Sequence, residues 1–195
     1  MYIAIEGIDT AGKSTQIKAL QNHFQNALIT KEPGGTKIGT EIREMVLSAK
    51  AQSKKAEFLL FLADRAEHTQ EVIKPNLDKM IISDRSAVSG IAYALVQGNI
   101  AKEELITLNN FATDSIYPQK VFLLRLTQKE LEFRLSQKEL DGIELRGSEY
   151  LLSIQEALIQ AANLLQIELV TIDATQSVEE ITKQILNNIN VDESR

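Results

Sequence analysis

The residues best suited to chemistry form one glycine-rich stretch near the start of the chain, from Gly7 to Ser14. Its letters, GIDTAGKS, match the phosphate-binding loop pattern G-x-x-x-x-G-K-[ST]. An apolar run at residues 2–5 precedes it and suits a buried strand, while residues 15–24 have helical spacing. In that context backbone N–H groups and a helix N-terminus bind nucleotide phosphates. Lys13 is then predicted to reach the β- and γ-phosphates, and the Ser14 hydroxyl to ligate Mg²⁺.

A second residue is predicted to support the same metal ion. Residues 80–84 form an apolar run that ends in Asp84 and is followed at once by Arg85. In phosphate-loop proteins an acidic residue at a strand end commonly supports Mg²⁺. Apolar runs that end in aspartate are common, so the loop at residues 7–14 is what gives this pattern its weight.

Three arginines and one aromatic residue fall near strand ends or on helices that could face the same pocket: Arg43, Phe61, Arg65 and Arg85. Guanidinium groups bind phosphate in a planar, bidentate way, so the arginines could hold a second phosphorylated molecule. Phe61 could stack on a nucleobase. The alternative for Phe61 and Arg65, four residues apart, is a second packing surface or a subunit contact, and the helix alone does not decide between them.

A polar connection at about residues 134–147 has the character of a mobile lid. Its candidate charge donors are Arg134, Lys138 and Arg146. Such a lid would exclude water and stabilise charge on a transferring phosphoryl group. Lys138 and Arg146 could equally be solvated surface charges.

The elements that must position these residues alternate along the chain. Strands are predicted near residues 2–5, 27–30, 80–84, 121–126 and 168–172, and helices near 15–24, 39–47, 56–73, 86–96, 101–112, 131–136, 148–165 and 178–189. This alternation is typical of a mostly parallel sheet with helices on both faces, and ligands should gather at the carboxyl ends of its strands. In the helix expected at 56–73, the core face is predicted to carry Ala56, Leu59, Leu60 and Ala63, with Phe61 and Arg65 on the opposite side.

Composition narrows the function classes. The 195 residues suit one domain, and a net charge of −6 argues against a nucleic-acid surface. There are no cysteines, which excludes disulfides and cysteine nucleophiles. Neither a signal-like segment nor an apolar run long enough to span a membrane is present. We therefore expect a cytoplasmic enzyme without a membrane partner.

Taken together, these motifs resemble those of the bacterial thymidylate kinase family. The resemblance covers essentially the whole chain and is carried by Glu6–Thr15, Lys31–Thr36, Phe61–His68, Asp84–Ser86 with Ser89 and Tyr93, and Ile172–Thr175. It implies a three-layer α/β fold of the P-loop NTPase type, in which a five-stranded parallel sheet is flanked by helices and carries a lid. It also implies phosphoryl transfer from ATP to dTMP with Mg²⁺, in a homodimer that uses Phe58, Leu62 and part of the helix at 86–96.

The resemblance assigns a role to each site residue. The implied ATP-binding residues are Gly7, Ile8, Asp9, Thr10, Ala11, Gly12, Lys13, Ser14, Thr15, Arg134 and Ala174. The implied dTMP-binding residues are Asp9, Pro33, Arg43, Phe61, Arg65, Arg85, Ser89, Gly90 and Tyr93. Lys13, Arg85, Asp9 and Arg134 are implied as catalytic, and Ser14 and Asp84 as metal ligands. Phe61 would stack on thymine, Arg43 and Arg85 would hold the dTMP phosphate, and Tyr93 would disfavour a ribose 2′-hydroxyl.

Several positions depart from the family pattern. Thr10 stands where eukaryotic members have arginine, which indicates the bacterial arrangement with a catalytic arginine in the lid. The lid's usual Asp-Arg pair reads Asp141-Gly142, so we expect that arginine to be Arg134, with Arg146 as the alternative. Gly90 replaces an Asn or Gln of many bacterial relatives, and Lys31 replaces an Arg.

Other functions are weighed against this interpretation. A phosphate-loop switch would be expected to carry a guanine-specifying Asn-Lys-x-Asp motif, which the sequence lacks. A non-catalytic scaffold would not need Lys13, Ser14, Asp84 and Arg85 together. The nearest alternative within enzymes is a kinase for another nucleoside monophosphate or for a deoxynucleoside.

Overall fold

The computed structural model describes residues 1–48, 53–139 and 144–190. Five strands form one sheet in the order β2-β3-β1-β4-β5, and every neighbouring pair is parallel. The strands are β1 (Tyr2–Glu6), β2 (Leu28–Lys31), β3 (Ile81–Asp84), β4 (Lys120–Arg125) and β5 (Glu168–Asp173). The predicted five-stranded parallel sheet is therefore confirmed.

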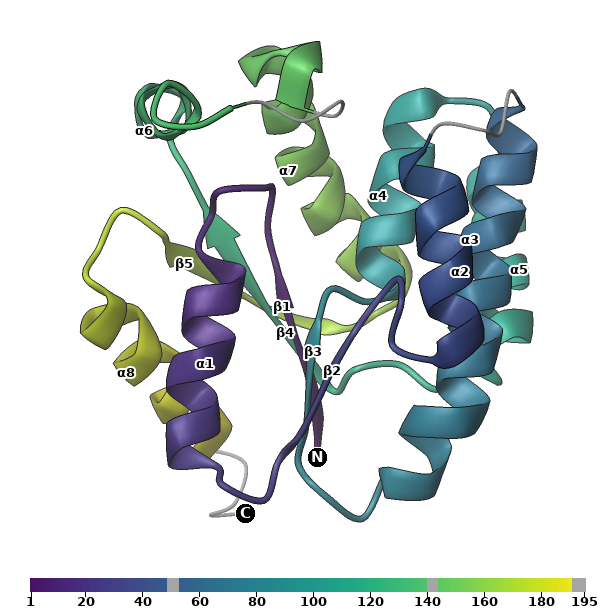
Figure 1. The fold of residues 1–195 in the computed structure, drawn as a ribbon, viewed down its shortest axis with the longest axis horizontal. Coiled ribbons are helices and arrows are strands. Elements are labelled where there is room, and N and C mark those ends of the chain that lie inside the picture. The colour runs from purple at the N-terminus through teal and green to yellow at the C-terminus, as the bar shows by residue number, and fades with distance from the viewer. Residues whose placement is uncertain (49–52, 140–143, 191–195) are drawn as a thin grey trace.

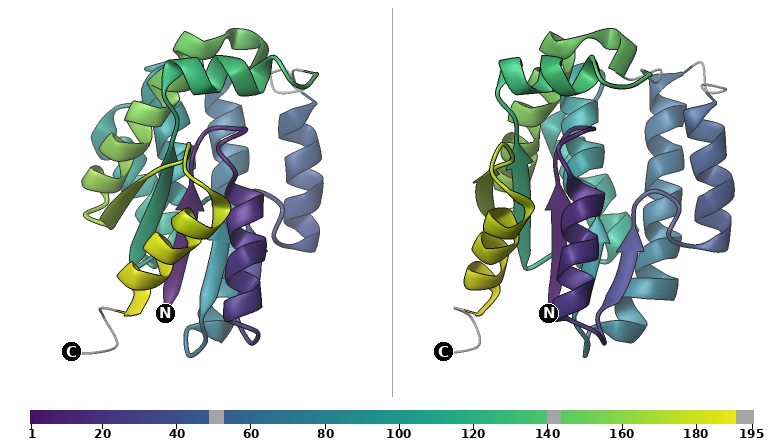
Figure 2. Two further views of the ribbon diagram at one scale, coloured as in Figure 1. Left: turned by 90° about the vertical axis from the view of Figure 1, so that its left-hand side faces the viewer. Right: turned by 60° about the vertical axis from the view of Figure 1, so that its left-hand side comes forward.

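Helices cover both faces of this sheet and make three layers (Figure 1). They are α1 (Lys13–His23), α2 (Lys37–Leu47), α3 (Lys54–His68), α4 (Ala87–Gln97), α5 (Lys102–Thr113), α6 (Gln128–Leu135), α7 (Ser148–Leu164) and α8 (Val178–Asn190). The α1 and α8 helices pack together on one face, and α7 packs on the other with α4 against it (Figure 2). The α3 helix joins α2, α4 and α5 in the second layer. The α6 helix lies beyond the carboxyl ends of the strands, where ligands are expected.

The central strands consist largely of apolar residues because helices bury them on both faces. All five residues of β1 are buried, as are the first five of β4. In the register, Ile5 lies opposite Asp84 and Lys31 also lies opposite Asp84, so the ends of three strands align. This alignment brings the phosphate-binding loop, the loop after β2 and the end of β3 to one edge of the sheet.

The α3 helix differs most from its prediction. It begins at Lys54 and ends at His68, and one π-helical turn, Thr69–Ile73, continues the chain. The predicted core face is wrong, because Leu59 is 56% exposed and Ala56 and Ala63 are also exposed.

The residues of α3 that are buried are instead Phe58, Leu62, Asp64, Arg65 and His68. The apolar pattern failed because paired polar side chains occupy much of the inner face. Phe58 and Leu62, which the resemblance implied as dimer contacts, are thus buried in the chain's own core.

The α6 helix begins three residues earlier than predicted, at Gln128 rather than at Leu131. The hydroxyl of Thr127 caps it by accepting a hydrogen bond from the Glu130 N–H at 3.3 Å. This start puts Arg134 in the last turn of the helix. Within the ranges described above, none of the helices has the length and apolar character needed to cross a membrane.

Candidate active site

The phosphate-binding loop connects β1 directly to α1. Gly7 and Gly12 have φ values of +151° and +95°, which side-chain-bearing residues rarely adopt. A Cβ on Gly7 would also lie 2.9 Å from the Leu124 carbonyl oxygen. These two positions therefore require glycine, as the motif predicts.

Lys13 starts α1 and folds back over the loop. Its Nζ donates hydrogen bonds to the carbonyl oxygens of Gly7 at 3.0 Å and Ile8 at 3.2 Å, and lies 3.6 Å from Asp9 Oδ1. Burial, helped by the nearby Arg85 charge, lowers the pKa of Lys13 to about 8, although Asp9 opposes the shift. The ammonium group is held in a site where added negative charge would be favourable.

Arg85 connects the loop to the far side of the site. It follows β3 with a left-handed φ of +70°, and its guanidinium group donates to Asp9 Oδ1 at 2.6 Å and to Gly7 O at 3.2 Å. It also donates to the Ser89 hydroxyl on α4 at 3.2 Å. Burial alone would raise the pKa of Asp9, but the charges of Arg85 and Lys13 outweigh it and lower that pKa. The structure thus brings four predicted site residues together.

Glu6 is a site residue whose role the sequence did not reveal. Its carboxylate is fully buried and accepts hydrogen bonds from Ser86 Oγ at 2.8 Å and from Ser89 Oγ at 2.5 Å. Burial raises the pKa of Glu6, while the charge of Arg85 and the two serine hydroxyls oppose the rise. Glu6 therefore joins the end of β1 to the start of α4. The sequence marks Glu6 as a glutamate at the end of an apolar strand, in the stretch Glu6–Thr15 that carries the family resemblance.

The loop after β2 is held by buried polar contacts from α3. Asp64 Oδ1 accepts a hydrogen bond from the Gly34 N–H at 2.8 Å. Arg43 on α2 donates to the Pro33 carbonyl oxygen at 3.0 Å. Burial raises the pKa of Asp64 to about 6, against the hydrogen bond from Gly34. This loop carries Pro33 and positions Arg43 toward the same edge of the sheet.

Glu32 is the centre of a second buried network. Its Oε2 accepts from Arg65 Nε at 2.9 Å, and its Oε1 lies 3.0 Å from His68 Nδ1. The other His68 nitrogen lies 2.6 Å from the Thr30 hydroxyl. Burial would raise the pKa of Glu32, but Arg65 and then His68 outweigh it and lower that pKa. Arg65 also donates to Asn109 Oδ1 on α5 at 2.7 Å, so the predicted acceptor-side arginine is fixed from two sides.

The remaining acceptor-side predictions lie on the same elements. Phe61 is half-buried and lies one helical turn before Arg65 on α3. On α4, burial raises the pKa of Tyr93 to about 12, against the nearby Arg85 charge and with the help of Asp9. Gly90, also on α4, lies beside the Nη1 and Nη2 atoms of the Arg65 guanidinium group.

The two residues predicted to ligate Mg²⁺ are Ser14 and Asp84. Both line one cavity of about 520 Å³ between α1 and β2. Asp84 Oδ1 is buried and makes no hydrogen bond in the described part of the chain, which leaves an oxygen free to ligate a cation. The described residues contain no cluster of three carboxylate, histidine or cysteine side chains for a metal. Such a sparse donor set suits Mg²⁺, which usually takes one or two carboxylates together with substrate phosphates.

Arg134 ties the lid region to the nucleotide side of the site. It donates to the carbonyl oxygens of Thr10 at 3.0 Å and Ala174 at 2.7 Å, and its Nε donates to Glu130 at 2.7 Å. The structure therefore brings together three residues predicted to bind ATP.

Other lid residues have partners outside that cluster. The guanidinium carbon of Arg146 lies 5.0 Å from the centre of the Tyr150 ring, and Nη1 donates to the Tyr150 hydroxyl at 2.9 Å. Lys138 pairs with the buried Glu144 at 2.9 Å. Lys138 and Arg146 are thus more than free surface charges. The Asp141-Gly142 pair lies outside the described residues.

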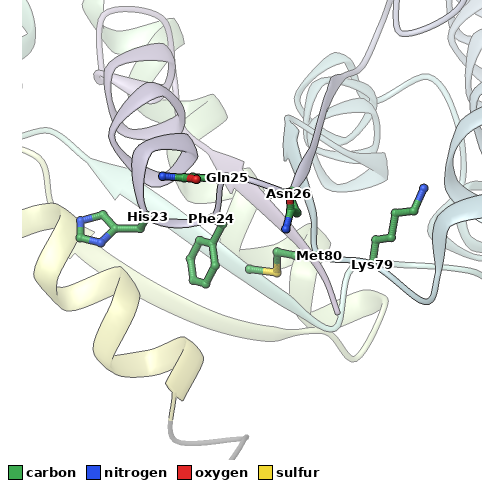
Figure 3. A pocket seen from close by; sticks show the side chains of 7 residues that line it. His23, Phe24, Gln25, Asn26, Lys79 and Met80 are labelled. Atoms are coloured by element: carbon green, nitrogen blue, oxygen red, sulfur yellow. The ribbon is translucent and has the colours of Figure 1, made fainter.

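A second hollow lies at the opposite end of the sheet (Figure 3). Its lining consists of His23, Phe24, Gln25, Asn26, Ala27, Lys79 and Met80. These residues precede β2 and β3, so the hollow is at the amino ends of the strands, away from the phosphate-binding loop. Ligands in open parallel sheets bind outside the carboxyl ends. The geometry therefore favours the cavity that contains Ser14 and Asp84.

Comparison with known proteins identifies the family. The family model described as thymidylate kinase matches residues 5–185. The chain belongs to the thymidylate kinase family. Its reaction is therefore the ATP-dependent phosphorylation of dTMP to dTDP, as the resemblance implied.

Individual thymidylate kinases agree with this assignment along the whole chain. The chain is 73% identical to the thymidylate kinase of Sulfurimonas denitrificans over 98% of its own length and 100% of that protein. It is 54% identical to that of Wolinella succinogenes over 96% and 97% of the two chains. Its fold is similar to the crystal structure of a thymidylate kinase from Ehrlichia chaffeensis, with a TM-score of 0.72, 26% identity and coverage of 97% and 98%.

Proposed function

We propose that this chain, as one nucleotide kinase domain over residues 1–195, binds ATP at the phosphate-binding loop and dTMP between α2, α3 and α4. The observation that carries this assignment is the position of Arg85. It is bonded to Asp9 and Gly7 of the loop and to Ser89 of α4, so it touches both halves of the site. Phosphoryl transfer depends on positioning and charge neutralisation, and a shared guanidinium group provides both.

On the donor side, the loop residues 7–15 bind the phosphates of ATP, with Lys13 at the β- and γ-phosphates. Arg134 and Ala174 bind the adenosine end, which their hydrogen bond to each other supports. All three guanidinium nitrogens of Arg134 already have protein partners, so its planar face is the part left to contact a nucleotide. A catalytic contact of Arg134 with the transferring group would require it to exchange one of these partners.

Ser14 and Asp84 would hold Mg²⁺ beside the phosphates, where the ion supplies charge neutralisation for the transfer. The buried, unpartnered Asp84 Oδ1 supports this role. Asp9 stays ionised because its pKa is lowered, and it holds Arg85 in place from the loop.

On the acceptor side, Arg43 and Arg85 hold the dTMP phosphate next to the γ-phosphate of ATP. Phe61 stacks on thymine, and Arg65 donates hydrogen bonds to the edge of the base. The proposed pocket is completed by Pro33, Ser89, Gly90 and Tyr93. Glu32 and Asn109 fix the orientation of Arg65. This supports its role in recognition of the base, because a pre-positioned donor loses little entropy on binding.

Two further properties belong to this proposal. The chain acts in the cytoplasm, and it forms a homodimer through the outer face of α2 and α3. Ile38 and Met45 on α2 and Leu59 on α3 are large apolar side chains exposed on helices that pack against each other, which supports a subunit contact there. Light scattering of wild type and Leu59→Glu measures the oligomeric state. A dimer that becomes a monomer in the variant is expected, and a monomeric wild type at micromolar concentration would contradict it.

A coupled assay of ADP release tests the reaction and the pocket together. Wild type, Phe61→Ala and the control Phe111→Ala are each given ATP, Mg²⁺ and a panel of nucleoside monophosphates. We expect activity selective for dTMP and a KM for dTMP raised about tenfold or more in Phe61→Ala, since base stacking contributes roughly 1–3 kcal/mol. Phe111 is exposed on α5, so its variant should behave like wild type. ATP hydrolysis that no monophosphate alters would refute the kinase assignment and favour a regulatory ATPase.

A further inference from the structure

The Arg65 guanidinium group is clamped by three elements at once. Its Nε donates to Glu32 after β2, and its Nη1 donates to Asn109 Oδ1 on α5, 44 residues along the chain. The guanidinium edge that carries Nη1 and Nη2 faces Gly90 of α4, where a Cβ would lie 2.6 Å from Nη2 and 3.2 Å from Nη1. Arg65 is 2% exposed and Asn109 0%, so the clamp is inside the protein. Only a glycine on α4 leaves room for it.

Asn109 has a single orientation in this clamp. Its Nδ2 donates to the Leu105 carbonyl oxygen at 2.7 Å, which leaves Oδ1 to face Arg65. If the amide were turned over, its NH2 group would point at the guanidinium group and lose both hydrogen bonds. Asn109 therefore presents an acceptor to Nη1 and cannot exchange it for a donor without a loss of stability.

The guanidinium N–H groups that remain beside Gly90 can only donate hydrogen bonds, because arginine has no acceptor. A base edge with a carbonyl oxygen at that point can accept one of them. A base edge with an amino group would place donor against donor in a buried site, and such a mismatch is rejected strongly. The direction in which the Arg65 N–H groups point thus determines which bases the site accepts. Asn109 fixes that direction.

We infer that Asn109 is a specificity-determining positioning residue, which holds the Nη1 and Nη2 edge of Arg65 beside Gly90 so that the site selects pyrimidine monophosphates with a 4-oxo group over those with a 4-amino group. This inference rests on the proposed role of Arg65 at the base edge. Asn109 does not touch the substrate. It acts through Arg65, and its effect is on the ratio of two substrates rather than on the chemical step.

The test compares kcat/KM for dTMP, dUMP and dCMP in wild type and Asn109→Leu. Leucine has a similar volume but offers no acceptor, so the preference for dTMP and dUMP over dCMP should fall about tenfold or more, the size expected for one buried hydrogen bond to a charged group. Asn109→Asp keeps an oxygen facing Arg65 and should restore most of the preference. Asn110→Leu is the matched control, because Asn110 is its neighbour on α5 and instead accepts a hydrogen bond from Tyr117.

Two further variants separate the possible failures. Gly90→Ala adds the Cβ that would collide with Nη2, and it should lower the same ratio while leaving α5 unchanged. Gly90→Ala also tests the inference about the clamp if Asn109→Leu does not fold. Arg65→Met removes the donor itself and tests the proposed function. If Arg65→Met weakens dTMP binding while Asn109→Leu, or failing that Gly90→Ala, leaves the ratio unchanged, the inference about the clamp is overturned. If Arg65→Met leaves dTMP binding and base preference unchanged, both the proposed role of Arg65 and the inference about the clamp are overturned.

Discussion

Replacement of Asp64 by asparagine should stabilise the folded protein at neutral pH and should have little effect in acid. Asp64 is 1% exposed on α3, and its Oδ1 accepts the Gly34 N–H hydrogen bond at 2.8 Å. Burial raises the pKa of this carboxyl from 3.8 to about 6, with a further contribution from Glu32. Ionisation of Asp64 therefore lowers the free energy of unfolding, while an asparagine can accept the same hydrogen bond without a charge.

The sign and size of the effect follow from this raised pKa. A carboxyl whose pKa is higher in the folded state stabilises the fold fully below its unfolded pKa of 3.8, and that contribution is lost as the pH rises through about 6. A rise of roughly two pKa units corresponds to at most about 3 kcal/mol. The free energy of unfolding of Asp64→Asn should thus exceed that of wild type by up to this amount at pH 7.5.

Urea unfolding followed by circular dichroism at pH 4.5, 5.5, 6.5 and 7.5 measures this difference. Asp78→Asn is the matched control, because Asp78 is exposed and its variant should track wild type at every pH. A difference between Asp64→Asn and wild type that does not grow from pH 4.5 to 7.5 would show that Asp64 titrates like an exposed carboxyl. A variant less stable at pH 7.5 would show that the charge itself holds the Gly34 loop.

Three other results are expected from the site. Because the pKa of Lys13 is about 8 in the free protein and bound phosphates should raise it, calorimetry in buffers of different ionisation enthalpy should detect proton uptake on ATP binding at pH 8. Little uptake is expected at pH 6, and equal uptake at both would contradict this. Asp84→Asn should need about 10- to 100-fold more Mg²⁺ for its half-maximal rate, and an unchanged requirement would exclude Asp84 from the metal site. Arg43→Ala should raise the KM for dTMP about 10- to 100-fold in the coupled assay, with the KM for ATP unchanged as the internal control.

The donor side was predictable because its chemistry is local in the sequence. The phosphate-binding loop, its two glycines and Lys13 lie within eight positions, and the loop geometry depends on backbone torsions that only glycine supplies at Gly7 and Gly12. The five strands could be predicted from the sequence equally well, because burial on both faces requires continuous apolar runs. The position of Asp84 at the end of such a run is likewise evident from the sequence alone.

The acceptor side was predictable only in part because its contacts are distant in the sequence and polar. Arg65 was expected at the site, but its partners Glu32 and Asn109 are 33 and 44 residues away, and no periodicity marks such pairs. The same pairs caused the wrong core face of α3. Arg65 and His68 are buried through hydrogen bonds, whereas the apolar Leu59 is exposed, so a pattern that equates apolar with buried selects the opposite face.

This contrast has a functional consequence. The donor loop can be built from backbone alone, because phosphate groups are the same in every nucleotide and N–H groups suffice to bind them. A base must be read by side chains whose donors point in one direction, and that direction has to be fixed against rotation. In this chain the fixing groups are Glu32 and Asn109, neither of which needs to touch the base, and Gly90 leaves the space that the guanidinium group occupies. Changes in base preference should therefore arise at these buried supports as readily as at Phe61 or Arg65 themselves.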